Sequence, residues 1–236
     1  MIIAANLKTN FTRAQTTKYV NELENFMQTN NISQEVLVFP AASSLNPHSG
    51  DVIIGAQNAY AAQNGAFTGE IGLDHLEEFG IKTILIGHSE RRHVLGEDQE
   101  TIVAKFNFYK DLGFKIVYCI GESLQIREAG EKVMMNYLNS QLEGIDLEYE
   151  NLVIAYEPVW AIGTGVTPTL DDIEYLHLKL KDRCNVPLLY GGSVKVTNAK
   201  EVLALKGVDG ILVGSAALYA EHFCTMIEYA QQLENK

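Results

Sequence analysis

The chain has 236 residues, of which 47% are hydrophobic and 20% charged. This composition excludes an intrinsically disordered protein and predicts one globular domain over residues 1–236 with a sizeable core. The net charge of −12 argues against a surface that binds nucleic acid or an anionic membrane.

Short apolar segments rich in β-branched residues recur along the chain and are typical of buried strands. In chain order they are Ile2–Ala5, Val36–Phe39, Val52–Gly55, Thr83–Ile86, Ile116–Ile120, Val153–Tyr156, Leu188–Tyr190 and Ile211–Val213. Most of the intervals carry apolar residues at helical spacing, as in residues 16–27, 133–142 and 173–180. Strands that alternate with helices indicate a parallel sheet with right-handed crossovers.

An open doubly wound sheet and a closed barrel share this alternation. An open dinucleotide-binding sheet would show a glycine fingerprint after its first strand, but Asn6-Leu7-Lys8-Thr9 follows instead. The interval 40–51 contains Pro40, Pro47 and Gly50 and is too short for an ordinary crossover helix. The length and the eight units therefore predict a (β/α)8 TIM barrel with a shortened or missing second helix.

Polar residues follow several of the predicted strands, and in such a barrel the carboxyl ends of the strands form the active site. They are Asn6 and Lys8, the segment Gly87 to Arg92, Glu157, the segment Gly191 to Ser193, and Gly214 with Ser215. Singly, each has a structural alternative: a surface charge, a hydrogen-bonded core histidine, an ion-pair partner or a tight turn. Together at one rim they indicate a site, and the glycine-rich ends of the last two strands favour a phosphorylated small molecule.

Neither a metal site nor a membrane segment is predicted. Cys119, Cys184 and Cys224 are far apart, without zinc-like spacing, and Cys119 is interpreted as a packed core thiol. No apolar run approaches the roughly 20 residues that a membrane helix needs. We expect a soluble, cytoplasmic protein with reduced thiols.

Several longer segments resemble the triosephosphate isomerase family, in family order and over nearly the whole chain. They are Ala56-Gln57-Asn58, Asn64 to Glu70, Gly87 to Arg92, Cys119 to Glu122, Tyr156 to Gly165, and Tyr190 to Ser193. The resemblance implies interconversion of dihydroxyacetone phosphate and D-glyceraldehyde 3-phosphate, a step of glycolysis and gluconeogenesis, with no cofactor.

The resemblance also implies roles for individual side chains. Glu157 is the expected general base, and His88 the expected neutral electrophile, its pKa kept low by the N-terminus of the following helix. Lys8 is expected to stabilise the enediolate and attract the phosphate, with Asn6 donating nearby. Pro158 begins the expected lid, which would exclude water from the reaction.

The remaining site residues are also implied by the resemblance. Phosphate-binding roles fall to Gly163, Ser193, Gly214 and Ser215, and supporting roles to Glu90, which pairs with the lysine, and to Ser89, Trp160 and Tyr190. A homodimer is expected through the loop 59–72, whose tip at Thr68 would enter the neighbouring subunit beside its Lys8 and His88.

The chain departs from the family pattern at four positions. Leu7 and Ala5 replace a frequent tryptophan and glycine, and Ser215 replaces the second glycine of a pair. Pro168 stands where the family donates a backbone N–H to the hydroxyl equivalent to that of Tyr190, and proline has no such donor. None of these departures removes an expected catalytic group.

Two other function classes are alternatives. A Schiff-base aldolase on a phosphate-binding barrel needs a desolvated lysine at a strand end, and only Lys8 qualifies. A non-catalytic barrel is the second alternative, against which the intact Glu157, His88 and Lys8 argue. One coupled activity assay distinguishes these classes.

Overall fold

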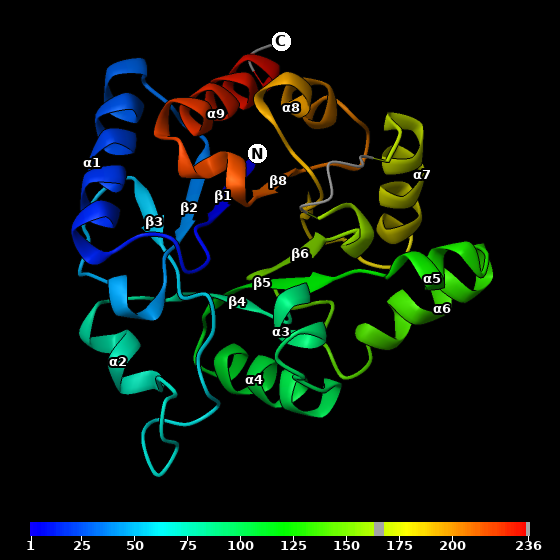
Figure 1. The fold of residues 1–236 in the computed structure, drawn as a ribbon, viewed down its shortest axis with the longest axis horizontal. Coiled ribbons are helices and arrows are strands. Elements are labelled where there is room, and N and C mark those ends of the chain that lie inside the picture. Colours follow the sequence, from blue (N-terminus) through cyan, green and yellow to red (C-terminus); the bar gives the residue numbers. More distant parts are fainter. Residues whose placement is uncertain (163–167, 235–236) are drawn as a thin grey trace.

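The computed structural model describes residues 1–162 and 168–234. Within these residues, eight parallel strands form one sheet in the order β3-β2-β1-β8-β7-β6-β5-β4. Their bounds are β1 Ile2–Asn6, β2 Glu35–Phe39, β3 Val52–Ile54, β4 Thr83–Ile86, β5 Lys115–Ile120, β6 Leu152–Tyr156, β7 Leu188–Tyr190 and β8 Gly210–Val213. A parallel bridge between Ala56 and Ile84 joins the two edges, so the sheet nearly closes into a TIM barrel (Figure 1).

The predicted strands are confirmed, and their ends differ from the structure by at most one residue. The prediction succeeds because strands covered on both faces read as continuous apolar runs. In β1, for example, every residue from Ile2 to Asn6 is buried.

Helices and short turns connect the strands around the outside of the barrel (Figure 1). The α-helices are α1 Arg13–Asn30, α2 Leu73–Glu78, α3 Ser89–His93, α4 Gln99–Asp111, α5 Leu124–Glu128, α6 Glu131–Gln141, α7 Leu170–Lys181, α8 Val196–Leu203 and α9 Ala220–Glu234. The 3-10 turns are η1 Ala42–Ser44, η2 Val159–Ala161 and η3 Ser215–Leu218. Local sequence marks several ends: Thr12 caps α1 in a capping box with Gln15, and Asn31 ends that helix in the left-handed region.

The second crossover contains no α-helix, as predicted, and only the turn η1 lies between β2 and β3. A carboxylate from α1 fastens this connection: Glu24 accepts hydrogen bonds from the backbone N–H groups of Val52 at 2.7 Å and Asp51 at 3.2 Å, and contacts Nε2 of His48 at 2.8 Å. Glu24 therefore anchors the loop that replaces a helix.

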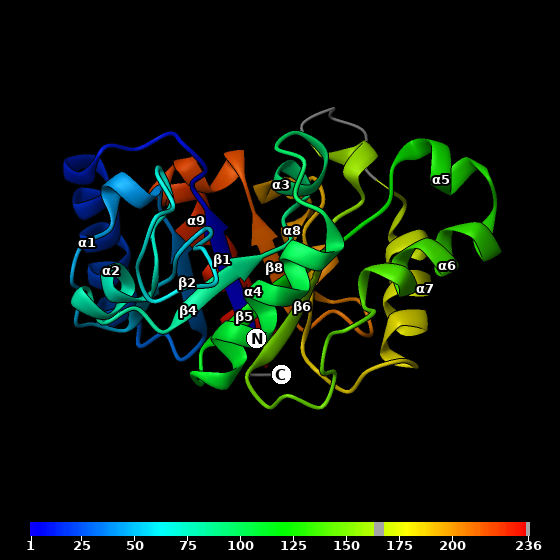
Figure 2. The same ribbon diagram turned by 90° about the horizontal axis from the view of Figure 1, so that it is seen from below.

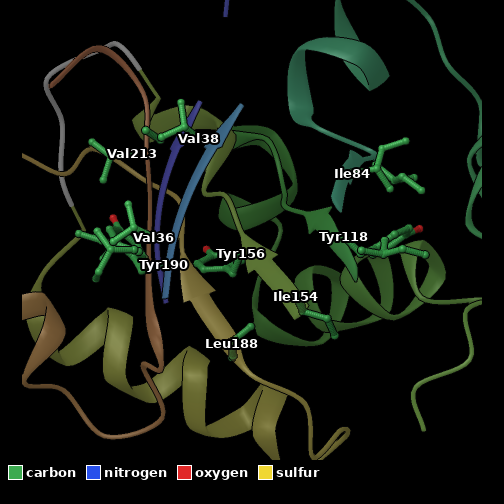
Figure 3. Close-up of a cluster of buried hydrophobic side chains, with 14 of the residues drawn as sticks. Val36, Val38, Ile84, Tyr118, Ile154, Tyr156, Leu188, Tyr190 and Val213 are labelled. Carbon is green, nitrogen blue, oxygen red and sulfur yellow. The ribbon is translucent and has the colours of Figure 1, made fainter. Parts of the chain in front are cut away.

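Side chains of the strands form two apolar layers. One fills the barrel and includes Ala4, Leu37, Val117, Cys119 and Leu189. The other packs between the strands and the surrounding helices, and Figure 3 shows part of it, including Val36, Ile84, Ile154 and Val213. Cys119 lies in the inner layer, as the interpretation of a packed core thiol requires.

The two ends of the barrel differ in character. Met1 and the end of α9 lie at one end of the barrel, where the Met1 amino group pairs with Glu234, and α3 lies at the other (Figure 2). Because all strands are parallel, their carboxyl ends gather on the α3 side. No helix in the described residues has the length and apolar character needed to span a bilayer.

Candidate active site

A cavity of 580 Å³ opens at the carboxyl ends of the strands. It brings together most of the predicted site residues, namely Asn6, Lys8, His88, Glu157, Ser193, Gly214 and Ser215. Asn6 ends β1 and the others follow β1, β4, β6, β7 and β8, so the parallel topology alone brings them together. Gly163 falls outside the described residues.

Glu157 follows β6 directly and is only 2% exposed. Its Oε1 lies 3.0 Å from Nε2 of His88, and its Oε2 accepts a hydrogen bond of 3.0 Å from the backbone N–H of Ser89. Burial alone would raise the pKa of Glu157, but His88, the Ser89 N–H and Lys8 together hold it below its usual value. The carboxylate is therefore ionised.

Two glycines make room for this carboxylate. A Cβ on Gly191 would lie 2.9 Å from Cγ of Glu157, and one on Gly121 would lie 1.7 Å from the Glu157 carbonyl oxygen. Both positions require glycine for close approach.

His88 is 7% exposed and stands at the N-cap of α3, where its Nδ1 accepts a hydrogen bond of 3.2 Å from the Glu90 N–H. Nδ1 acts as an acceptor, so Nε2 carries the proton that faces Glu157. The predicted low pKa of His88 is wrong for this arrangement. Burial lowers the pKa, but the adjacent Glu157 carboxylate outweighs it, so the pKa of His88 lies above its usual value.

Lys8 adopts a left-handed backbone conformation with φ of 52°, which is uncommon for a residue other than glycine and is one of the strained conformations that cluster at functional sites. Neighbours hold it there: its N–H donates to Oδ1 of Asn6 at 3.0 Å, and its carbonyl oxygen accepts from Nε2 of Gln57 at 2.7 Å. Its ammonium nitrogen lies 2.5 Å from Oε1 of Glu90, which is the ion pair expected from the sequence.

Gln57 is a site residue to which sequence reasoning assigned no role. Its amide bonds the carbonyl oxygens of Lys8 and Phe39, which joins the ends of β1 and β2. The only signal was its position in the segment Ala56-Gln57-Asn58, and nothing in that segment indicates which distant carbonyls it binds.

Three of the predicted phosphate-binding residues, Ser193, Gly214 and Ser215, line this cavity. The backbone N–H groups of Ser193 and Ser215 donate to no other described backbone group, and Gly214 caps the short helix η3. A Cβ on Gly214 would lie 3.4 Å from Cε of Lys8. Free N–H groups, a helix start and a lysine side chain together suit an anion.

Trp160 and Tyr190 are not among the described residues that line this cavity. The indole Nε1 of Trp160 donates to Oε1 of Glu122 at 3.0 Å, and the Tyr156 hydroxyl donates to the same oxygen at 3.0 Å. Glu122 is fully buried, and sequence reasoning assigned it no role. The buried hydroxyl of Tyr190 has no hydrogen-bond partner among the described residues.

The sequence profile described as triosephosphate isomerase matches residues 1–230. Triosephosphate isomerases from several organisms also match over nearly the whole chain. That of Sulfurimonas denitrificans is 69% identical over 236 residues, covering 100% of this chain and 98% of the relative. That of a Sulfurovum species is 56% identical and covers 96% of this chain and 99% of the relative. That of a Nitratiruptor species is 53% identical and covers 99% of this chain and 100% of the relative.

The chain belongs to the triosephosphate isomerase family. Its departures from the pattern of that family lie beside the site without opening it. Ala5 and Leu7 are fully buried on either side of Asn6, and Ser215 is exposed at the cavity. The described residues contain no cluster of three or more histidine, cysteine or acidic side chains that could hold a metal ion.

Proposed function

We propose that this chain carries out the reaction of the triosephosphate isomerase family, the interconversion of dihydroxyacetone phosphate and D-glyceraldehyde 3-phosphate. The observation that carries the proposal is the pair of an ionised carboxylate, Glu157, and an imidazole N–H, on His88, facing one cavity beside the Lys8 ammonium. A base, a hydrogen-bond donor and a cation are the groups that an enediolate intermediate requires.

In the proposed mechanism Glu157 removes a proton from one substrate carbon and returns it to the adjacent carbon, while the proton of the substrate hydroxyl passes to the former carbonyl oxygen. Nε2–H of His88 donates to the carbonyl oxygen as negative charge develops there, and Lys8 stabilises that charge. To reach the substrate carbon, the carboxylate must exchange its bonds to His88 and to the Ser89 N–H for contact with the substrate. Two hydrogen bonds thus hold the base close to its place of action.

The geometry favours this reaction over Schiff-base chemistry. A Schiff-base lysine attacks as a neutral amine, whereas the Lys8 ammonium pairs with the Glu90 carboxylate at 2.5 Å. Borohydride added with substrate should therefore leave the protein unlabelled.

A coupled assay of the purified protein tests the proposal. The wild type should turn over both triose phosphates, and Glu157→Gln, purified in the same way, should be nearly inactive. The second protein also controls for an isomerase carried over from the expression host. Equal rates for the two proteins, or no rate for the wild type, would overturn the assignment.

We further propose a homodimer formed through residues 59–72. This loop projects from the barrel between β3 and α2 (Figure 1), and backbone hydrogen bonds such as Tyr60 N–H to the Ile71 carbonyl at 2.8 Å keep it in shape. Thr68 lies at its exposed tip beside Phe67, which is 41% exposed. A second cavity, of 450 Å³, lies beside Lys8, His88 and the 64% exposed Leu95 and suits such a tip.

Deleting residues 64–70 should give an inactive monomer on a sizing column. Leu95→Glu, which leaves the loop intact, should weaken the dimer in the same direction because it places a charge in the cavity. Leu178→Glu, at an exposed leucine on α7, is the control. An active monomer in either test variant would contradict the proposal. The reaction is expected in the cytoplasm, where the three free cysteines would stay reduced.

A further inference from the structure

Arg127, on α5, contacts groups from two segments that are distant in sequence. Its guanidinium carbon lies 5.0 Å from the centroid of the Trp160 ring, and its Nη2 lies 3.2 Å from Oδ1 of Asp172. Trp160 precedes residues 163–167 and Asp172 follows them. One side chain thus connects the two sides of this stretch.

On the Trp160 side, the contacts lead to the proposed base. Nη1 of Arg127 lies 3.5 Å from Oε1 of Glu122, the oxygen that also accepts from Trp160 and from Tyr156. Tyr156 immediately precedes Glu157. Burial raises the pKa of Glu122, and the hydrogen bonds from Trp160 and Tyr156 and the nearby Arg127 guanidinium act against that rise, so the guanidinium favours the charged form together with the two donors.

On the Asp172 side, the contacts lead to the start of α7. Oδ2 of Asp172 accepts hydrogen bonds from the hydroxyl and the backbone N–H of Thr169, at 2.7 and 3.3 Å, while Oδ1 faces Arg127. The two oxygens thus serve different partners. The carboxylate both caps α7 and ties its first turn to α5.

The hydrogen bond that the family resemblance implies between the backbone N–H of residue 168 and the Tyr190 hydroxyl cannot form in this chain. Pro168 is buried and has no N–H to donate, and the Tyr190 hydroxyl has no partner within residues 1–162 and 168–234. The Arg127–Asp172 pair, by contrast, spans the same two sides through charged groups. Charge-assisted hydrogen bonds are roughly twice as strong as neutral ones.

We propose that Arg127 and Asp172 are positioning residues, which brace the segment 156–160 that carries Glu157 against the first turn of α7. The catalytic part of this inference rests on the proposed isomerase function. The brace itself is a property of the fold and has its own readout. Trp160 is the only tryptophan of the chain, so intrinsic fluorescence reports on one end of the brace alone.

The alternative is a surface ion pair that contributes little to stability or positioning, because the side chains of Arg127 and Asp172 are 24% and 48% exposed. Asp172→Asn distinguishes a positioning contact from a surface ion pair. The amide oxygen can still accept the hydrogen bonds from Thr169, but the negative charge facing Arg127 is lost. Asp171→Asn is the matched control: Asp171 is an exposed acid in the same turn and takes no part in the brace.

Asp172→Asn should change the fluorescence emission of Trp160 and increase its quenching by acrylamide. It should also lower kcat about threefold to tenfold with KM nearly unchanged, because a small displacement of the base lowers the rate of proton transfer. Asp171→Asn should match the wild type in every measurement. Asp172→Glu, which retains the charge, should recover most of both effects.

Identical fluorescence and kcat for Asp172→Asn and Asp171→Asn would overturn the brace. So would an Asp172→Asn effect that Asp172→Glu does not recover, because a lost helix cap would then suffice as the cause. If the wild type has no isomerase activity, the proposed function fails, and the fluorescence comparison still decides whether the brace exists.

Discussion

Nε2 of His88 and Oε1 of Glu157 lie 3.0 Å apart, and both side chains are more than nine-tenths buried. The proposed electrophile and the proposed base are therefore hydrogen-bonded to each other inside one cavity. Their titrations are coupled: the pKa of Glu157 is lowered and that of His88 is raised.

This coupling predicts a pH window for stability. The Glu157 contribution is fully present above its unfolded pKa of 4.5 and is lost as pH falls through the lowered folded value. The His88 contribution is fully present below its unfolded pKa of 6.5 and is lost as pH rises through the raised folded value. The difference in unfolding free energy between the wild type and Glu157→Gln should therefore be largest between about pH 4.5 and 6.5. Urea titrations at fixed protein concentration measure this difference, and one that grows steadily above pH 7 would contradict the coupling.

Shortening the proposed base should impair catalysis without unfolding the protein. In Glu157→Asp the carboxylate is withdrawn by about 1 Å, so kcat should fall roughly 10²-fold or more. Steady-state kinetics give the effect, and circular dichroism serves as the control for folding. Turnover near that of the wild type would exclude Glu157 as the base.

His177 should make the protein sensitive to acid. It is fully buried with its Nδ1 3.1 Å from the Gly207 carbonyl oxygen, and burial lowers its pKa to about 4. The unfolded chain binds this proton near pH 6.5, so stability falls as pH drops from 6.5 to 4, by about 3 kcal/mol at 1.36 kcal/mol per pKa unit.

The measurement for His177 is the unfolding free energy at several pH values in that window. His177→Gln retains a donor for the Gly207 carbonyl and should show a shallower decline with acid than the wild type. The exposed His222, replaced by Gln, is the control and should leave the decline unchanged. If the unfolding free energy declines with falling pH equally steeply in all three proteins, His177 is not the cause of the acid sensitivity.

Tyr190 should contribute little to turnover through its hydroxyl. That hydroxyl has no partner among the described residues, and Pro168 cannot supply the expected N–H. Tyr190→Phe should change kcat less than about threefold, whereas Pro168→Ala creates a donor worth about 0.5–1.5 kcal/mol and should make the hydroxyl matter.

A double-mutant cycle on kcat, and on affinity for a phosphorylated transition-state analogue, tests this dependence. The coupling between positions 168 and 190 should appear only when residue 168 has an N–H. A tenfold loss from Tyr190→Phe in the Pro168 background would show that the hydroxyl has a different partner.

Glu24 should be important for stability although it lies far from the cavity. Burial raises its pKa, but hydrogen bonds from Val52, His48 and Asp51 outweigh this and lower it. Glu24→Gln weakens these charge-assisted bonds and should cost about 1–3 kcal/mol of unfolding free energy. Glu22→Gln, which removes only an exposed pair with Lys18, should cost less than about 0.5 kcal/mol. Equal effects of the two variants would refute the anchoring role of Glu24.

The sequence by itself determined the strands, the missing second helix and the rim on which the site residues lie. These follow from local physics: a strand covered on both faces must be apolar, the prolines and glycine of residues 40–51 prevent a helix, and parallel strands place Lys8, His88 and Glu157 at one end. The family resemblance then supplied the expected roles of those residues.

Only the tertiary structure decided which groups touch across the barrel. The raised pKa of His88 arises because the Glu157 carboxylate, 69 positions later, faces its Nε2–H, and a helix N-terminus visible in the sequence could not indicate this. In the same way Gln57 binds the Lys8 carbonyl and Arg127 reaches Asp172. Such contacts depend on how the closed sheet and its helices pack, and local periodicity carries no information about them.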